Sequence, residues 1–426
     1  MRILGVSQRV YLGDLYLALI GEGYDVRVHA RDPAADCAFG GLIPTVADWR
    51  AELDWVGRDG VILFEGVNQG AQQDALRRDG YRVIGGSAFG DRLENDRDFG
   101  QAVLRDAGLL VAAVQAFDDP AAARAWLAAN PGRYVLKHDH GAHATYVGEH
   151  PDGLDVDFRL RRVMEGGGHQ GRLLLMQCLD GVEVGVGAYF DGAAFLRPAC
   201  LDFEHKRFFP GEMGEMTGEM GTLASYDGAD RLFDATLGRL AGVLGQAGHV
   251  GYVNLNLIVN MDGAWPLEFT CRIGNPGFAV LAALQTDGWG DLLARMADGG
   301  GGSFAYRRGW SVAIVLTIPP FPAFDPAATP DADHPVFFRV SPGAEDRANY
   351  HFVDMRQDRG GQLLAHKRSG HVMIVTGAGD TVPAAQAAAR ARAANVMSPE
   401  LRWRADIGDR FLSRDREMLH ALGWLS

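Results

Sequence analysis

Short apolar runs alternate with amphipathic stretches along the first 110 residues of the chain. The apolar runs predict β-strands, and the amphipathic stretches predict the helices between them. The expected strands are 2–6, 24–29, 60–64 and 81–84, and the expected helices are 13–21, 69–79 and 97–107. Strands that alternate with helices at this spacing indicate a parallel sheet covered by helices. No Gly-x-Gly-x-x-Gly turn follows the first strand, so the sequence does not support a dinucleotide site there.

The pattern after residue 110 mixes strands and helices. The expected strands are 111–116, 133–138, 173–178, 311–318 and 371–376, the expected helices are 120–129, 229–247 and 382–394, and 251–260 with 264–273 forms an expected hairpin. The glycine run at 298–302 predicts a flexible linker. We therefore expect an α/β protein with an N-terminal domain over 1–110, a central domain over 111–302 that contains a subdomain over 111–185, and a small α+β domain over 303–426.

Composition and charge exclude several classes of protein. The 426 residues are 47% hydrophobic and 22% charged, which is ordinary for a globular enzyme and excludes a disordered or coiled-coil chain. No apolar run reaches the roughly 20 residues of a membrane helix, and the N-terminus lacks the apolar stretch of a signal peptide. The net charge of −13 argues against a nucleic-acid partner. The cysteines are scattered, which predicts neither a disulfide framework nor a zinc site and fits a reducing cytoplasm; they are Cys37, Cys178, Cys200 and Cys271.

Lysine is rare, since only three of the 41 basic residues are lysines: Lys137, Lys206 and Lys367. Arginine can supply most surface charge, but its planar guanidinium does not always replace a compact ammonium group that binds phosphate. Lys137 ends an apolar strand and precedes a glycine-containing loop, where an ammonium group can reach a nucleotide phosphate. The alternative is a strand-end lysine that extends its amine into solvent.

A second candidate site runs from the apolar strand at 173–178 through a turn to Glu183. A purine can stack on such a strand and bond its exposed backbone, while a nearby carboxylate accepts hydrogen bonds from the ribose hydroxyls. An ordinary β-hairpin with a surface carboxylate explains the same residues. This segment alone therefore leaves both interpretations open.

A third candidate is the sequence Glu-His-Lys-Arg at 204–207, which places three potential cations before a glycine-rich loop at 211–221. Backbone N–H groups in such a loop can approach anions. Clustered cations can stabilise a polyphosphate or a developing oxyanion. The alternative is a solvated run of charges beside a mobile surface loop.

The predicted hairpin carries polar side chains on one face. Side chains alternate along a strand, so Asn254 and Asn256 share a face, as do Glu268, Thr270 and Arg272. A three-residue turn with a left-handed glycine would bring the two sets together. Their oxygen atoms suit Mg²⁺, and the arginine could hold a transferring phosphoryl group. A two-residue Asp-Gly turn would put the sets on opposite faces, and a solvent-facing polar hairpin is the alternative.

These four features follow one another in the order found in ATP-grasp enzymes. More narrowly, the chain resembles the phosphoribosylamine–glycine ligase family over almost its whole length. Segments 204–207, 216–221 and 267–276 are similar to the family's Asp-His-Lys-Arg, Asn-Thr-Gly-Gly-Met-Gly and Glu-Phe-Asn-x-Arg-Phe-Gly-Asp-Pro motifs. Residues 369–381 are similar to its Gly-Gly-Arg-Val strand and Ala-Leu-Gly-Asp-Thr turn. The resemblance implies an ATP-grasp fold in which 111–185 is the nucleotide lid.

The resemblance also implies an enzyme that uses ATP and Mg²⁺, with Mn²⁺ as an alternative metal. A small-molecule carboxylate would be activated as an acyl phosphate and attacked by a small-molecule amine, without nucleic acid or membrane; a homodimer is left open. The implied nucleotide contacts are Arg97, Lys137, Lys206, Glu183 at the ribose, and the backbone of Gln177 and Leu179 at adenine. The implied metal ligands are Asn256, Glu268 and Thr270, the catalytic residues Lys206 and Arg272, and the substrate contacts Thr217, Gly218 and Asn275.

The chain departs from the family's motifs mainly on the substrate side. Residues 7–11 read Ser-Gln-Arg-Val-Tyr in place of Gly-Gly-Arg-Glu-His, and residues 143–146 replace a Gly-Lys-Gly. Thr270 replaces an asparagine, while Asn275 and Gly277 replace the two carboxylates of Gly-Asp-Pro-Glu. We therefore expect the ligase chemistry with substrates outside purine synthesis. Phosphoribosylamine–glycine ligase itself is the alternative, and a degenerate nucleotide-binding protein without turnover is the second alternative.

Overall fold

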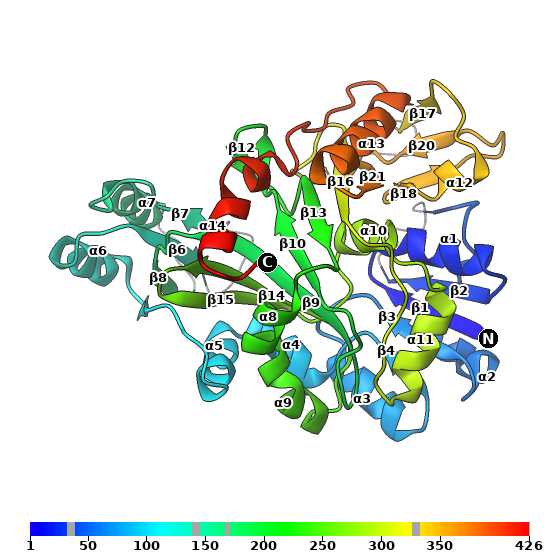
Figure 1. Ribbon diagram of the computed structural model, residues 1–426, viewed down its shortest axis with the longest axis horizontal. Helices are drawn as coiled ribbons and strands as arrows, with labels where there is room; N and C mark the ends of the chain where they lie inside the picture. The colour runs from blue at the N-terminus through cyan, green and yellow to red at the C-terminus, as the bar shows by residue number, and fades with distance from the viewer. Residues whose placement is uncertain (32–38, 139–144, 167–170, 326–332, 426) are drawn as a thin grey trace. The chain divides into compact units, whose positions relative to one another are not determined.

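The computed structural model describes residues 1–31, 39–138, 145–166, 171–325 and 333–425 (Figure 1). The chain forms two compact units. The first contains Met1–Val103, Glu183–Leu257 and Glu268–Ser426, and the second contains Leu104–Val182 and Ile258–Leu267. The predicted 111–185 subdomain falls almost wholly within the second unit. No helix in the part of the chain that the structure describes is long and apolar enough to cross a membrane.

The N-terminal part of the first unit is built on a parallel four-stranded sheet in the order β2-β1-β3-β4, as predicted. The strands are β1 (Arg2–Ser7), β2 (Asp25–Ala30), β3 (Val61–Phe64) and β4 (Arg82–Ile84). The helical segments are α1 (Gly13–Gly21), η2 (Trp49–Glu52), α2 (Leu53–Val56), α3 (Gly70–Arg78), α4 (Ala88–Asn95) and α5 (Arg97–Asp106). Apolar strand residues such as Leu4, Ile62 and Val83 are buried together in one core, which explains the unbroken apolar runs of the sequence.

The largest sheet has eight strands in the order β15-β14-β9-β10-β13-β16-β21-β18 (Figure 1). The strands are β9 (Val182–Asp191), β10 (Cys200–Glu204), β13 (Gly221–Ser225), β14 (Val250–Asn260), β15 (Gly263–Thr270), β16 (Trp310–Thr317), β18 (Tyr350–Phe352) and β21 (His371–Gly379). β13 pairs antiparallel with β16, and these strands lie on either side of the glycine run at 298–302. The predicted boundary at residues 302 and 303 therefore falls inside one sheet and one compact unit.

Helices and smaller strands complete the first unit. The helical segments are α8 (Asp230–Ala235), η3 (Leu237–Leu240), α9 (Ala241–Gln246), α10 (Gly277–Ala282), α11 (Trp289–Asp298), α12 (Ala344–Arg347), α13 (Val382–Asn395), η5 (Phe411–Asp415) and α14 (Arg416–Ala421). The further strands are β11 (Arg207–Phe209), β12 (Met213–Met216), β17 (His334–Phe338), β19 (Met355–Gln357), β20 (Leu363–Ala365) and β22 (Val396–Met397). α13 lies against β16 and β21 (Figure 1). A Cβ atom at Gly377 would come within 2.4 Å of Ala385 O, so this close approach requires glycine.

The single helix predicted over 229–247 is wrong, because the structure breaks it into α8, η3 and α9. Thr236 stands at the break with φ −130° and ψ −94°, outside the helical region. Its hydroxyl donates to Leu232 O at 2.5 Å, which offers the backbone a side-chain bond in place of a continued helix.

The second unit is an antiparallel sheet in the order β5-β8-β6-β7 with two helices. Its elements are β5 (Val114–Phe117), α6 (Pro120–Ala129), β6 (Tyr134–His138), β7 (Tyr146–Val147), α7 (Leu154–Glu165) and β8 (Leu173–Gln177). Leu127 of α6, Leu160 of α7 and Leu175 of β8 share one core, so both helices cover the same face. α7 was not predicted, although its buried residues Val156 and Leu160 are four positions apart, as on a helix face.

Candidate active site

Three carboxylates surround Lys206 immediately after β10. Its Nζ lies 3.0 Å from Glu204 Oε2 and 3.3 Å from both Glu183 Oε1 and Glu268 Oε1. Glu183 comes from β9, Glu204 from β10 and Glu268 from β15, so three strands of one sheet bring the carboxylates together. One ammonium group therefore faces three carboxylates, and the site carries an excess of negative charge.

Burial and charge act in opposite directions on this cluster. Burial lowers the pKa of Lys206, but the carboxylates of Glu204, Glu183 and Glu268 outweigh it and raise the pKa above its usual value. Burial raises the pKa of Glu204, while Lys206 lowers it. Lys206 therefore stays protonated, and an anion such as phosphate can compete with the carboxylates for it.

Asp202 adds a further carboxyl group to the same pocket. It accepts a hydrogen bond from Asn254 Nδ2 at 2.6 Å. Burial, followed by the charge of Glu204, raises the pKa of Asp202 to about 7. Asn254, which the sequence placed on the polar hairpin face, is thus engaged by a buried acid.

The expectation of three consecutive cations at 205–207 is wrong. His205 is 1% exposed, and burial lowers its pKa to about 3, so it is neutral near pH 7. Its Nε2 accepts a hydrogen bond from Gly408 N. Arg207 donates to Gly214 O across the β11–β12 pair. Only Lys206 of the three faces the carboxylate pocket, which the sequence could not show because it does not reveal burial.

The glycine-rich loop folds into the short hairpin of β11 and β12. Thr217 was predicted to contact the substrate. Its hydroxyl donates a hydrogen bond to Lys206 O at 2.8 Å, which stabilises the local backbone. Gly218 lines the pocket, and a Cβ atom there would meet nothing within 4 Å. Glu219, the next residue, also lines the pocket, and the sequence analysis did not single it out.

The polar face of the β14–β15 hairpin forms largely as predicted. The strand ends leave Met261 and Asp262 between them, one residue fewer than expected, and Gly263 has φ 135°. Asn254, Glu268 and Thr270 nevertheless line one pocket. Asn256 is buried, and its Nδ2 donates to Glu183 Oε1 at 3.0 Å.

The oxygen atoms of this face are of the types that bind Mg²⁺, which prefers carboxylate and neutral oxygen ligands. Glu268 is partly exposed, with 46% of its side chain accessible, and Thr270 lies beside it in the pocket. Among the residues that the structure describes, no group of three His, Cys, Asp or Glu side chains is arranged to hold a metal ion. The donor set therefore suits a metal shared with nucleotide phosphates better than a permanently bound one.

Arg272 and Asn275 reach the pocket from the segment that follows β15. Arg272 Nε donates to Glu94 Oε1 at 3.1 Å, and the backbone N–H of Cys271 donates to Glu94 Oε2. Glu94 thus fixes the guanidinium at the pocket wall. Asn275 Nδ2 donates to Tyr11 O in the N-terminal loop.

Hydrogen bonds of Ser7, both within the N-terminal loop and to Glu65, hold that loop in place. Ser7 Oγ accepts from the backbone N–H groups of Arg9 and Val10, and it donates to Glu65 Oε2 at 2.6 Å. The serine that replaces the family's first glycine is therefore a structural element of the loop.

Lys137 lies in β6 of the second unit, opposite Leu174 of β8. Side chains alternate along a strand, so it shares a face with Val135, which packs with Met176. Lys137 is 8% exposed, which disfavours the alternative of an amine extended into solvent. The loop at 139–144 lies outside the described residues, and it includes the first two residues of the altered segment 143–146.

The other predicted nucleotide contacts lie on separate elements. The N–H of Gln177 already donates to Ala113 O at 3.0 Å, which leaves its carbonyl and the backbone of Leu179 as predicted adenine contacts. Arg97 begins α5 in the first unit. The nucleotide contacts stay predictions.

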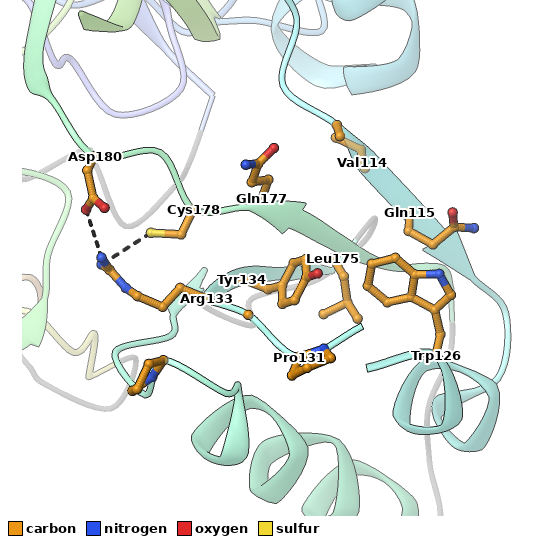
Figure 2. A pocket seen from close by; sticks show the side chains of 13 residues that line it. Val114, Gln115, Trp126, Pro131, Arg133, Tyr134, Leu175, Gln177, Cys178 and Asp180 are labelled. Carbon is orange, nitrogen blue, oxygen red and sulfur yellow. Dashed lines mark hydrogen bonds and ion pairs between the residues drawn. The ribbon is translucent and has the colours of Figure 1, made fainter. Parts of the chain in front are cut away.

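The second unit also contains a cavity of ≈570 Å³ (Figure 2). Trp126 and Tyr134 meet edge to face at its wall, and Arg133 bonds both Asp180 and Cys178. Leu175, which lines it, belongs to the core under α6 and α7. Lys137 lies opposite Leu174, whose side chain points to the other face of the sheet from that of Leu175. Lys137 therefore does not face this cavity, and the cavity is not the predicted phosphate site.

Comparison with known proteins identifies relatives along most of the chain. Residues 95–278 match the family model of the phosphoribosylglycinamide synthetase ATP-grasp (A) domain. The phosphoribosylamine–glycine ligase of Ralstonia nicotianae is 27% identical over 358 residues, which cover 80% of this chain and 81% of the relative. The enzyme of the same name from Mycobacterium leprae is 26% identical and covers 93% of this chain and 90% of its own.

Solved structures show the same fold. The phosphoribosylamine–glycine ligase of Thermotoga maritima superposes with a TM-score of 0.71 at 18% identity, covering 96% of this chain and all of its own. A biotin carboxylase from Campylobacter jejuni has a TM-score of 0.65 at 11% identity and covers 98% of both chains. These likenesses confirm the predicted ATP-grasp fold.

The relatives also correct one expectation. The expectation of substrates outside purine synthesis is contradicted, because the relatives that match along most of the chain are named phosphoribosylamine–glycine ligase. Similarity along most of the chain outweighs the altered positions at 7–11, 275 and 277, on which that expectation rested. The expected class of ATP-dependent C–N ligase is confirmed. The chain is an ATP-grasp protein that resembles phosphoribosylamine–glycine ligase.

Proposed function

We propose that this protein is a phosphoribosylamine–glycine ligase, which joins the glycine carboxylate to the amine of phosphoribosylamine at the cost of ATP. One observation carries the proposal. Three motif segments line a single pocket, through Lys206 of the first, Gly218 of the second, and Glu268 with Arg272 of the third, which lies well beyond the other two in the sequence. The names of the relatives supply the substrates.

In the proposed reaction a carboxylate oxygen of glycine attacks the γ-phosphorus of ATP, and ADP leaves. The amine then attacks the acyl carbon, and the C–O bond to phosphate breaks to release inorganic phosphate. Lys206 and Arg272 lie in one pocket, where their positive charges stabilise the phosphoryl group and the oxyanion of the second step. Glu94 holds Arg272 in place for this role.

The nucleotide would be bound by the predicted contacts, with Lys137 and Arg97 at the phosphates. Asn256, Glu268 and Thr270 would hold Mg²⁺, or Mn²⁺ in its place, which neutralises phosphate charge during phosphoryl transfer. Glu183 has two bonds in the described structure, to Lys206 and to Asn256. Its proposed contact with the ribose hydroxyls would replace the bond to Lys206 and leave that ammonium group for phosphate. The free thiols Cys178, Cys200 and Cys271 are compatible with a cytoplasmic enzyme.

The test is ADP release by the purified protein with each substrate omitted in turn. We expect ADP to form at an appreciable rate only when ATP, glycine and freshly generated phosphoribosylamine are all present, with one glycinamide ribonucleotide per ADP. ATP binding without any turnover would contradict the proposal and favour the degenerate nucleotide-binding alternative.

Lys137→Ala should lower kcat/KM for ATP by about tenfold or more, since a hydrogen bond to a charged group contributes roughly 1.5–3 kcal/mol. The matched control is Lys367→Ala, which removes an ammonium group that bonds Glu400 at 2.8 Å, away from the pocket. Steady-state kinetics with varied ATP measures both variants. Equal losses in the two would show that Lys137 does not bind the nucleotide.

A further inference from the structure

Three side-chain oxygens of the pocket around Lys206 lack a hydrogen-bond partner among the described residues. They are Glu219 Oε1, Thr222 Oγ1 and Asn275 Oδ1, and each atom is shielded from solvent. All three residues line the same cavity of ≈260 Å³. Thr222 is only 2% exposed. Buried polar atoms are rarely left unpaired in proteins, so these oxygens are available to accept hydrogen bonds from a group that enters the pocket.

The chemistry of the unpaired atoms defines that ligand. An ionised carboxylate oxygen and an amide oxygen only accept hydrogen bonds, and a threonine hydroxyl can accept as well. Burial and the charges of Glu204 and Asp202 raise the pKa of Glu219, and an ammonium group beside it would favour the ionised form. The amide of Asn275 is oriented by its Nδ2, which donates to Tyr11 O, so the oxygen is the atom left over. A ligand group with several N–H donors would therefore pair with these oxygens.

The charge of the pocket indicates a cation. Asp202, Glu204 and Glu219 contribute carboxyl groups near Lys206, and Arg272 is already paired with Glu94. Burial, and then the charges of Glu204 and Asp202, raise the pKa of Glu219. A cationic ligand would relieve this repulsion. Three unpaired acceptor oxygens suit an ammonium group, which has three N–H donors.

The sequence points to the same atoms independently. Position 219 is glycine in the family motif Asn-Thr-Gly-Gly-Met-Gly and glutamate here, while positions 275 and 277 are acidic in Gly-Asp-Pro-Glu and are Asn275 and Gly277 here. All three positions line this pocket. Relative to the family motifs, the pocket has thus lost carboxylates at positions 275 and 277 and gained one at position 219.

We propose that Glu219, Thr222 and Asn275 bind the α-ammonium group of the amino-acid substrate, with Glu219 supplying a carboxylate that the family places at 275 or 277. This inference rests on the proposed function, in which glycine enters with a free ammonium group. The altered motif then supplies the negative charge from position 219 in place of 275 or 277, and the pocket still binds an amino acid.

The first test is Glu219→Gln, which keeps the size of the side chain and removes its charge. We expect KM for glycine to rise about tenfold or more, with KM for ATP changed less than twofold and an unchanged melting temperature. Glu215→Gln, an exposed carboxylate on β12 outside the pocket, is the matched control and should leave both values unchanged. In Glu219→Gln/Asn275→Asp, a carboxylate returns at position 275, and KM for glycine should fall toward the wild-type value. An unchanged KM for glycine in Glu219→Gln would overturn the inference even if ligation is normal.

The second test separates this inference from the proposed function. Calorimetry with a non-hydrolysable ATP analogue present should show that the wild-type protein binds glycine but not glycolate, in which a hydroxyl replaces the ammonium group. Glu219→Gln should lose most of the glycine affinity. Glycine binding without ligation would reject the proposed function and keep the ammonium site, whereas equal binding of glycine and glycolate would overturn the ammonium site.

Discussion

Replacing Lys206 with methionine is expected to lower kcat by about 10²–10³-fold, the usual loss when one group that stabilises transition-state charge is removed. Methionine keeps most of the side-chain length, so packing changes little. The charge change is large, because Glu183, Glu204 and Glu268 would then face one another without a cation. Single-turnover measurement of acyl transfer checks the result.

The control for that experiment is Lys367→Met, which removes a lysine that bonds Glu400. Thermal melting should be recorded for both variants, since three uncompensated carboxylates also destabilise the fold. A folded Lys206→Met protein with activity within threefold of wild type would show that Lys206 only neutralises the carboxylates and takes no part in catalysis.

Glu268→Gln is expected to keep the fold and lose about 10²-fold or more in phosphoryl transfer, since removal of one electrostatic group commonly has this effect. An amide holds a hard cation much less well than a carboxylate does. Glu268 is partly exposed, so the substitution should cost little stability. The measurement is the rate of ADP formation as a function of Mg²⁺ concentration, and the half-saturating concentration should rise.

Thr270→Asn is the informative companion, because it restores the family's side chain beside Glu268. We expect it to leave the rate unchanged or to raise it at low Mg²⁺ concentration. Full activity of Glu268→Gln at all Mg²⁺ concentrations would show that the polar hairpin face is ordinary surface and that the metal assignment is wrong.

Local sequence patterns predicted most of the fold, and long-range pairing explains what they missed. The strands of the N-terminal sheet are buried on both faces, so their apolar runs are unambiguous. By contrast, β13 pairs with β16 across more than 80 residues, and no local signal at the glycine run at 298–302 reveals that pairing. At the break the Thr236 hydroxyl donates to Leu232 O, and helix propensity does not predict where such a break falls.

The candidate site likewise contains some features that the sequence predicts and others that only the structure shows. Asn254 and Glu268 line one pocket, although the three-residue turn on which the prediction depended is not formed and the strand ends leave only two residues between them. His205 looked like a cation in the sequence, but burial makes it neutral. Glu219 was not predicted as a site residue in a loop rich in glycine and glutamate, and only the structure shows that its unpaired oxygen and that of Asn275 belong to one pocket.

The most direct test of the central claim follows the oxygen atoms of glycine. If the glycine carboxylate is activated as an acyl phosphate, one of its oxygens must leave with the phosphate when the amine attacks. Glycine labelled with ¹⁸O in its carboxylate, incubated with ATP, Mg²⁺, phosphoribosylamine and the purified protein, should therefore give one ¹⁸O atom in each inorganic phosphate released. Turnover that yields unlabelled phosphate would contradict the account.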